Sequence, residues 1–383
     1  MLTPEINFTN FKLPQKKNVL KKKLLSIIKS DNEIINSLSK KYKYKFSKKN
    51  LKNYNKYLNV RIIGMGGSSL GAQAIYAFFK DKIKKKFHFV DNLQPNPISE
   101  KKKFLNIIIS KSGNTTETIV NANVIIKKKD KNIFITEKKN SYLYNLAEKL
   151  KSDIIHHNNY IGGRYSVLSE VGMLPAELMG LNSEKFKNLN SLVKNKKFIN
   201  ALVLSVNSIL QLSKQKKYNS IIINYDQNSE NFFKWYQQLV SESLGKKKKG
   251  FLPIVSNMPK DNHSVMQLYL DGFRNNFFTF FYVGENDSKK IKNNLILESQ
   301  KYLKNKTISE IIYSQKKATE NVFEKQKIPY RSFEIKKRKE KTLGELFSFF
   351  ILETILLGNA LNVNPYDQPA VELIKKETKK ILI

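Results

Sequence analysis

The chain has 383 residues, of which 40% are hydrophobic, so it is long enough for two α/β domains and has the composition of a folded protein. It contains no cysteine, which excludes disulfide bonds, thiolate metal ligands and cysteine nucleophiles and agrees with a cytoplasmic location. The 69 Lys and Arg residues outnumber the 32 Asp and Glu residues, but the lysines lie in small groups along the whole chain. We therefore expect a solvated basic surface that attracts phosphorylated ligands rather than a nucleic-acid-binding face.

The order of predicted elements favours an α/β fold. Residues 1–56 are predicted to form short helices with polar connections. Beyond them, runs of β-branched and aromatic residues alternate with helical patterns, which is typical of parallel sheets covered by helices. The predicted strands are 59–64, 86–91, 104–110, 132–136, 220–225, 251–256, 277–283 and 330–335. The predicted helices are 70–79, 116–129, 141–151, a helical stretch over 166–214, then 229–243, 263–273, 307–325, 341–361 and one at the C-terminus.

Two similar α/β units follow from this alternation. We predict an N-terminal helical segment (1–56), a first domain (57–190), a second domain (191–340) and a C-terminal helical arm (341–383). The longest apolar stretch, Leu346–Leu361, is shorter than a bilayer-spanning helix and contains Glu353, so we expect a buried helix and no membrane partner.

The first motif is GMGGSSLG, Gly64–Gly71, between a predicted strand and a predicted helix. Its backbone N–H groups and the helix N-terminus suit an anion. A dinucleotide site is one interpretation, with Asp91 placed as a ribose-binding acid, but Ser69 replaces the third glycine of that fingerprint. A tight strand-to-helix turn is the other interpretation.

The second motif, SKSGNTTET (Ser110–Thr118), also follows an apolar strand. It offers five hydroxyl side chains, Lys111 and a helix start within nine residues. Capping the helix requires only one such residue, for example Ser112 or Asn114, so the excess indicates a phosphate site.

Three further motifs supply charged groups. GGRYSVLS (Gly162–Ser169) places Arg164 after two glycines that allow close backbone approach. WYQQLVSESLGK (Trp235–Lys246) places Gln238 and Glu242 four residues apart, on one face of a helix. NPYDQPAVELIKK (Asn364–Lys376) is a proline-containing turn that enters a helix with Glu372 and Lys375.

His263 is the best acid–base candidate among the four histidines. It lies in MPKDNHSVMQLYLDG at a predicted helix start, beside polar neighbours. His88 is predicted to lie in a strand, and His156 and His157 in a loop.

The six motifs, in this order, resemble those of the glucose-6-phosphate isomerase family over about residues 60–376. The resemblance implies two sugar-isomerase (SIS) domains, each a parallel five-stranded sheet flanked by helices. It further implies a cofactor-free and metal-free aldose–ketose isomerase of glycolysis and gluconeogenesis. The enzyme would be a homodimer, and the reaction would pass through an enediolate intermediate. Departures such as Leu244, Ala370 and Ile374 lie beside the motif residues that would carry the chemistry.

The resemblance also implies roles for individual residues. Glu242 would move the proton between C1 and C2, Arg164 would stabilise the enediolate, and Lys375 with His263 of the partner subunit would open the sugar ring. Other residues would bind or support the substrate: Ser68, Ser110, Lys111, Ser112, Thr115, Gly67, Gly163, Gln238 and Glu117.

Two alternatives remain open. A sister enzyme acting on mannose 6-phosphate would carry nearly the same residues. A non-catalytic sugar-phosphate sensor would keep the phosphate loop but would not need Arg164, Glu242, His263 and Lys375 together.

Overall fold

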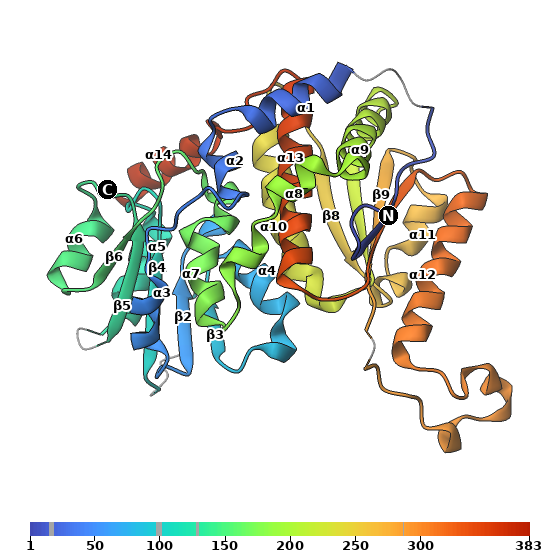
Figure 1. The fold of residues 1–383 in the computed structure, drawn as a ribbon, viewed down its shortest axis with the longest axis horizontal. Coiled ribbons are helices and arrows are strands. Elements are labelled where there is room, and N and C mark those ends of the chain that lie inside the picture. Colours follow the sequence, from blue (N-terminus) through green and yellow to red (C-terminus); the bar gives the residue numbers. More distant parts are fainter. Residues whose placement is uncertain (15–18, 97–101, 128–129, 286) are drawn as a thin grey trace.

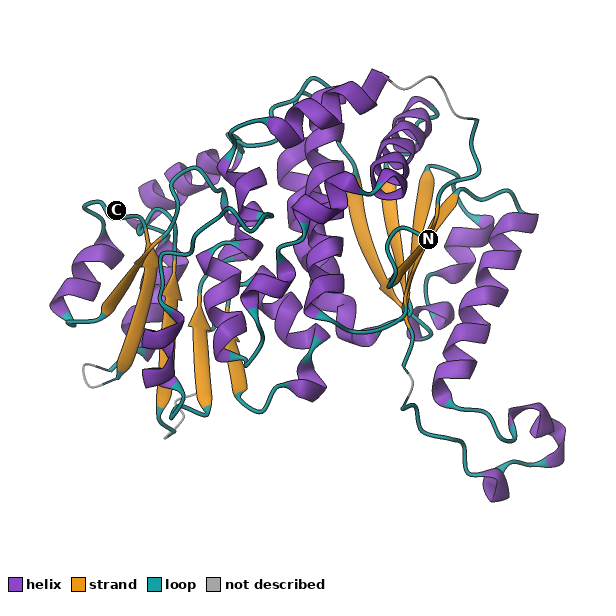
Figure 2. Cartoon of the chain, viewed as in Figure 1, coloured by secondary structure: helices purple, strands orange, loops and turns teal. Residues whose placement is uncertain are grey.

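The computed structural model describes residues 1–14, 19–96, 102–127, 130–285 and 287–383. Two five-stranded sheets lie next to one another along the longest axis of the molecule, and helices cover them (Figure 1). The predicted α/β class is confirmed, and Figure 2 shows helices between and around the two sheets.

The first sheet is parallel throughout, in the order β3-β2-β4-β5-β6. Its strands are β2 (Asn59–Ile63), β3 (Lys86–Val90), β4 (Phe104–Ile109), β5 (Lys131–Thr136) and β6 (Asp153–His156). The four strands predicted for this half are confirmed. The prediction that His156 lies in a loop is wrong, because His156 ends β6, a short edge strand whose side chains are only partly buried and therefore lack a strong apolar pattern.

The second sheet has the order β1-β10-β9-β7-β8. Its strands are β1 (Ile6–Thr9), β7 (Asn219–Asn224), β8 (Leu252–Asn257), β9 (Asn276–Val283) and β10 (Tyr330–Ile335). Four strands are parallel, as predicted, but β1 pairs antiparallel with β10, from Ile6 opposite Ile335 to Thr9 opposite Ser332. The prediction of a wholly parallel second sheet and a wholly helical N-terminal segment is therefore corrected: a four-residue edge strand held by a partner more than 300 residues away leaves almost no local signal.

The helices of the first half are α3 (Lys48–Leu51), α4 (Leu70–Phe78), α5 (Thr116–Ile125), α6 (Tyr142–Lys149) and α7 (Glu170–Leu178). Those of the second half are α8 (Leu189–Lys194), α9 (Lys196–Lys214), α10 (Glu230–Leu244), α11 (Met266–Asp271) and α12 (Ile308–Lys325). The remaining helices lie near the termini: α1 (Val19–Lys29), α2 (Glu33–Ser37), α13 (Glu340–Ala360) and α14 (Val371–Leu382). The helix predicted over 116–129 ends earlier, at Ile125, and residues 128 and 129 lie outside the described part.

One helix joins the two halves. α10 packs on α4 of the first half and on α13 of the second, and one continuous hydrophobic core includes Ile62 of the first sheet, Phe232 of α10 and Phe281 of the second sheet. Burial of such a core from water makes the main favourable contribution to the free energy of folding. The predicted boundaries at residues 56, 190 and 340 stay predictions.

The predicted apolar helix is α13, which is buried along almost its whole length. Among the described helices it alone is long and apolar enough to span a membrane, and 89% of its most apolar window is covered by the rest of the protein. Its Glu353 forms a fully buried ion pair with Arg331 of β10 and accepts a hydrogen bond from Ser205 of α9. A charge that would be costly in lipid is thus paired inside the protein core.

Candidate active site

The site lies where the connections of the first sheet diverge. β2 is the first strand of this sheet along the chain, yet it lies between β3 and β4, so the chain leaves β2 and β4 towards opposite sides. Ligands of open α/β sheets bind outside the carboxyl ends of the strands at such a switch point. The Gly64–Ser69 loop follows β2 and the Ser110–Thr115 loop follows β4.

The loop after β4 gathers hydroxyl side chains at the start of a helix. Ser110 Oγ and Thr115 Oγ1 lie 2.9 Å apart, and Ser112 Oγ accepts a hydrogen bond from the Asn114 N–H. Gly113 has φ +69°, and a Cβ there would lie 2.1 Å from Ser141 Oγ, so only glycine allows this turn. In the described structure no side chain caps the N-terminus of α5, which leaves its N–H groups available to an anion.

Lys111 supplies the positive charge of this loop. Its Nζ lies 3.9 Å from Glu137 Oε1, and its carbonyl accepts the N–H of Glu137 from β5's end. Burial lowers the pKa of the Lys111 ammonium, while Glu137 raises it. A phosphate would add a second anionic partner. Two predicted contributors flank the loop: Ser68, half-buried in the 3₁₀ turn Gly66–Ser68, and Glu117, half-buried in the first turn of α5.

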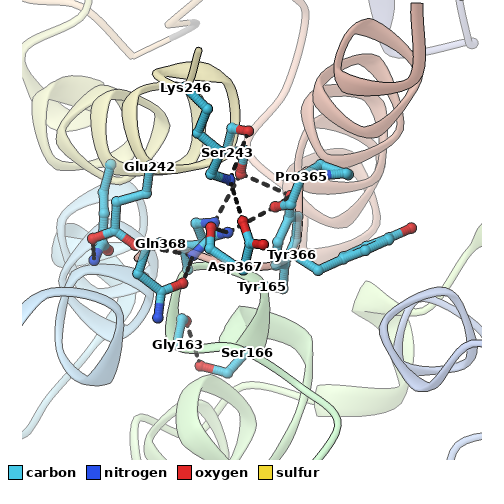
Figure 3. Close-up of polar contacts among 12 residues, drawn as sticks. Gly163, Tyr165, Ser166, Glu242, Ser243, Lys246, Pro365, Tyr366, Asp367 and Gln368 are labelled. Carbon is cyan, nitrogen blue, oxygen red and sulfur yellow. Dashed lines mark hydrogen bonds and ion pairs between the residues drawn. The ribbon is translucent and has the colours of Figure 1, made fainter. Parts of the chain in front are cut away.

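Arg164 is the centre of the second part of the site. It lies in the 3₁₀ helix Gly163–Leu168, and its side chain is 1% exposed. Its Nε donates to Ser243 Oγ (2.8 Å), and its Nη1 donates to Glu242 Oε2 (3.1 Å) and to Gln368 Oε1 (2.7 Å). Its Nη2 donates to the carbonyls of Pro365 (2.7 Å) and Asp367 (3.1 Å), and Figure 3 labels all five partners. All five N–H donors of the guanidinium are therefore used.

A ring of hydrogen bonds holds one edge of the guanidinium. Ser243 Oγ also lies 2.8 Å from the Tyr165 hydroxyl, which donates to the Pro365 carbonyl at 2.9 Å. Burial raises the pKa of Tyr165 to about 12, so its hydroxyl keeps its proton. Because the Tyr165 hydroxyl donates its one proton to the Pro365 carbonyl, Ser243 accepts from Arg164 and donates to the Tyr165 oxygen, which fixes the direction of every hydrogen bond in the ring. The backbone of Arg164 is held as well, since its carbonyl accepts the indole N–H of the fully buried Trp235 at 3.0 Å.

Glu242 lies between Arg164 and Gln238. Gln238 and Glu242 lie on one face of α10, as predicted from their spacing of four residues, and Gln238 Nε2 donates to Glu242 Oε1 at 2.8 Å. The Gly64–Ser69 loop lies against the same glutamine, since a Cβ on Gly66 would be 2.7 Å from Gln238 Nε2. The glutamine thus joins the loop after β2 to the Glu242 carboxylate.

The carboxylate borders a cavity of about 620 Å³. Glu242 is 29% exposed, and Gln368 and Asp367 form another wall of the cavity. Arg164 fixes one carboxylate oxygen and Gln238 the other, yet the group still faces the space that a small ligand could enter. A fixed carboxylate beside a buried cation is suited to moving a proton on carbon.

Two predicted residues lie apart from this cluster. His263 ends the 3₁₀ helix Lys260–His263 after β8, is exposed, and contacts neither Arg164 nor Glu242 among the described atoms. Lys375 lies on α14, whose residues are all exposed, and it pairs with Glu372 at 2.6 Å. The structure therefore brings together Arg164, Glu242 and Gln238 but not His263 or Lys375.

Sequence reasoning missed the residues that hold Arg164: Ser243, Tyr165, Asp367 and Gln368. All four residues lie inside the quoted motifs, so the motifs contained the signal that could have identified them. Their contacts with residues roughly 80 to 200 positions away could not be predicted from the motifs. The dinucleotide interpretation is not supported, because Asp91 instead accepts a hydrogen bond from Gln73 of α4 at 2.6 Å.

The two sheets and the hydroxyl-rich loop together define the class: a protein with two sugar-isomerase-type α/β domains. A model of the phosphoglucose isomerase family matches residues 32–383. The chain belongs to the phosphoglucose isomerase family.

Relatives agree with this assignment, and a solved structure has the same fold. The chain is 34% identical over 347 residues to a glucose-6-phosphate isomerase of Methanocaldococcus jannaschii, covering 85% of this chain and 84% of that protein. It is 31% identical to the Mycoplasmopsis pulmonis enzyme of the same name, covering 84% and 82%. The fold matches a glucose-6-phosphate isomerase from Chlamydia trachomatis with TM-score 0.71 and 17% identity, covering 97% of this chain and 80% of that one.

Proposed function

We propose that this chain is a glucose-6-phosphate isomerase that interconverts glucose 6-phosphate and fructose 6-phosphate in the cytoplasm. The observation that carries the proposal is the Glu242 carboxylate, fixed between Arg164 and Gln238 while facing a cavity. The relatives of the same name support the choice of substrate.

The phosphate would bind at the loop after β4. The hydroxyls of Ser110, Ser112 and Thr115, the ammonium of Lys111 and the uncapped N-terminus of α5 all carry donors suited to its oxygens. Ser68 would add a hydroxyl from the loop after β2, and Gly67 and Gly163 would let the backbone approach the substrate. With the phosphate held there, C1 and C2 of the open-chain sugar would extend towards Glu242.

Glu242 would act as the single base. It takes the proton from C2 of the open-chain aldose, the C2–H electron pair forms the C1–C2 double bond, and the carbonyl electrons move to O1. The resulting enediolate takes the same proton back at C1, while the hydroxyl proton moves from O2 to O1. A positioned base contributes about 10²- to 10⁴-fold to such a step.

Arg164 would stabilise the enediolate. Since its five N–H groups are all occupied, a substrate oxygen can reach one only by replacing a present acceptor. The bonds to Ser243 and to the two backbone carbonyls are held by the surrounding chain, whereas Gln368 contributes a side chain at the cavity wall. We expect the enediolate oxygen to take the place of Gln368 on Nη1.

His263 and Lys375 would open the ring of the bound sugar. His263 would come from the partner subunit of a homodimer, which agrees with its exposed position away from Glu242 in its own chain. Lys375 would approach from α14, beside Glu117 of α5 as a supporting group. In Figure 1 α14 is drawn beyond the carboxyl ends of the first sheet's strands.

Conversion of fructose 6-phosphate to glucose 6-phosphate by the purified protein tests the proposal. Glu242→Gln should reduce kcat at least about 10³-fold, because the amide cannot accept the proton. Glu230→Gln, at the start of the same helix and paired with Lys234 on the surface, is the matched control and should keep activity. A wild-type protein that binds but does not convert fructose 6-phosphate would indicate a sensor, and conversion of mannose 6-phosphate alone would indicate the sister enzyme.

A further inference from the structure

The turn that follows α10 has a strained backbone. Lys246 and Lys249 pair as an isolated β-bridge, and the two residues between them, Lys247 and Lys248, have φ +52° and +56°. Non-glycine residues in this conformation cost free energy, and such strain persists only where the surroundings hold it. Both lysines that flank the strained pair turn back towards the protein.

Lys246 reaches three oxygens with its ammonium group. Its Nζ donates to the carbonyl of Ser243 at 3.1 Å and to the carbonyl of Asn364 at 2.6 Å, and it lies 3.1 Å from Asp367 Oδ1 (Figure 3). Its side chain is only 12% exposed. Lys249 donates to the Leu361 carbonyl at 2.8 Å, so the turn is attached twice to the segment that follows α13.

The segment held by Lys246 is the one that holds Arg164. Nη2 of Arg164 donates to the carbonyls of Pro365 and Asp367, which lie within the stretch that Lys246 joins to α10. The Ser243 carbonyl on Lys246 belongs to the residue whose hydroxyl accepts from Arg164 Nε. Lys246 therefore fixes the oxygens that accept from Nε and Nη2 of Arg164. The remaining nitrogen, Nη1, contacts the side chains of Glu242 and Gln368, which are free to move.

We infer that Lys246 is a positioning residue: through the 364–367 turn it fixes which edge of the Arg164 guanidinium faces the substrate. This inference rests on the isomerase function proposed above. Lys246 borders the same cavity as Glu242, but its ammonium group is engaged by three protein oxygens of α10 and the turn, so the role assigned to it is to hold the turn. Without it the turn would lose a cation shared by three acceptors, and the guanidinium could rotate relative to Glu242.

The experiment compares Lys246→Met with Lys248→Met in fructose 6-phosphate conversion. Lys248 is exposed, belongs to the same strained turn, and forms no side-chain hydrogen bond or ion pair with the described residues, so its variant should match the wild type. Lys246→Met should lose about 10- to 100-fold in kcat, because displacements near 1 Å of a catalytic group have effects of this size. KM should change less than about threefold, since the phosphate loop is untouched.

Two further variants separate positioning from folding. Lys246→Arg keeps a cation with several donors and should recover most of kcat. In an Arg164→Lys background, Lys246→Met should cause little additional loss, because it acts through the group already removed. If Lys246→Met does not fold, judged by emission of Trp235, Asp367→Asn provides the same comparison with a smaller loss in kcat.

Each outcome is decisive. A wild-type enzyme without isomerase activity would overturn the proposed function and this inference with it. An active wild type in which Lys246→Met equals Lys248→Met, or in which the Lys246 and Arg164 effects multiply, would overturn the role of Lys246 alone.

Discussion

Gly67 and Gly163 are pressed together, backbone against backbone. A Cβ added to Gly67 would lie 2.1 Å from the carbonyl carbon of Gly163 and 2.5 Å from the Arg164 nitrogen. Contacts this short with backbone cannot be relieved by turning a flexible side chain. The loop after β2 thus sets the position at which the Arg164 segment begins.

Gly67→Ala should therefore separate the two loops and displace Arg164. We expect a folded protein that is less stable by about 1–3 kcal/mol, the usual cost of overpacking, and a kcat reduced by at least about tenfold. Gly162→Ala is the control, because a Cβ there meets only Tyr165 at 3.8 Å and its φ of −67° suits alanine. Urea unfolding and initial rates measure both effects, and unchanged rates in Gly67→Ala would contradict the expected displacement.

Lys111→Met tests the phosphate loop. Its ammonium would contact the phosphate equally in substrate and transition state, so we expect KM to rise with little change in kcat. Loss of one charge-assisted hydrogen bond corresponds to about 1.5–3 kcal/mol, or about 10- to 100-fold in KM. Lys138→Met removes an exposed lysine from the same sheet edge and should leave KM unchanged. A fall in kcat alone would place Lys111 with the reacting carbons.

Mixing two inactive chains tests the shared site. If His263 acts across a dimer, one chain with Glu242→Gln and one with His263→Ala together form a single intact site. Co-expression should then restore about a quarter of wild-type activity, because half of randomly formed dimers are mixed and each has one intact site of two. No recovery in dimers shown by mass to be mixed would mean that His263 serves its own chain or neither.

Local patterns sufficed for much of the fold and for one shared helix face in the site. The buried strands of both sheets were readable as short apolar runs, and the spacing of Gln238 and Glu242 placed both on one face of a helix, where the structure joins them by a hydrogen bond. β1 and β6 were missed because edge strands with few buried side chains owe their existence to a partner strand elsewhere in the chain.

The arrangement around Arg164 could not be read from the sequence for the same physical reason. Its acceptors come from α10 and from the 365–368 turn, which are about 80 and 200 residues away along the chain. A motif shows that these residues occur together, but only packing of α10 between both halves shows that Ser243 and the turn carbonyls face the same guanidinium. The partner of a buried polar group is a tertiary property.

The pH dependence of stability should reflect His157, which is 1% exposed beside the phosphate loop. Its Nδ1 donates to the Asn158 carbonyl at 3.0 Å, and its Nε2 has no hydrogen-bond partner among the described atoms. Burial lowers the pKa of His157 from 6.5 to about 4; the Asn158 carbonyl and Glu137 oppose this, whereas Lys111 and His156 add to it.

Because the pKa of His157 is lower in the folded protein than in the unfolded chain, the unfolded chain binds more protons at pH values between the two. Stability is therefore complete above pH 6.5 and falls as the pH drops towards 4, by about 3 kcal/mol in total. Urea unfolding of the wild type and of His157→Gln across this range measures the effect, and His156→Gln, which removes only the smallest of these contributions, should stay close to the wild-type slope. Equal slopes in wild type and His157→Gln would show that other groups cause the loss.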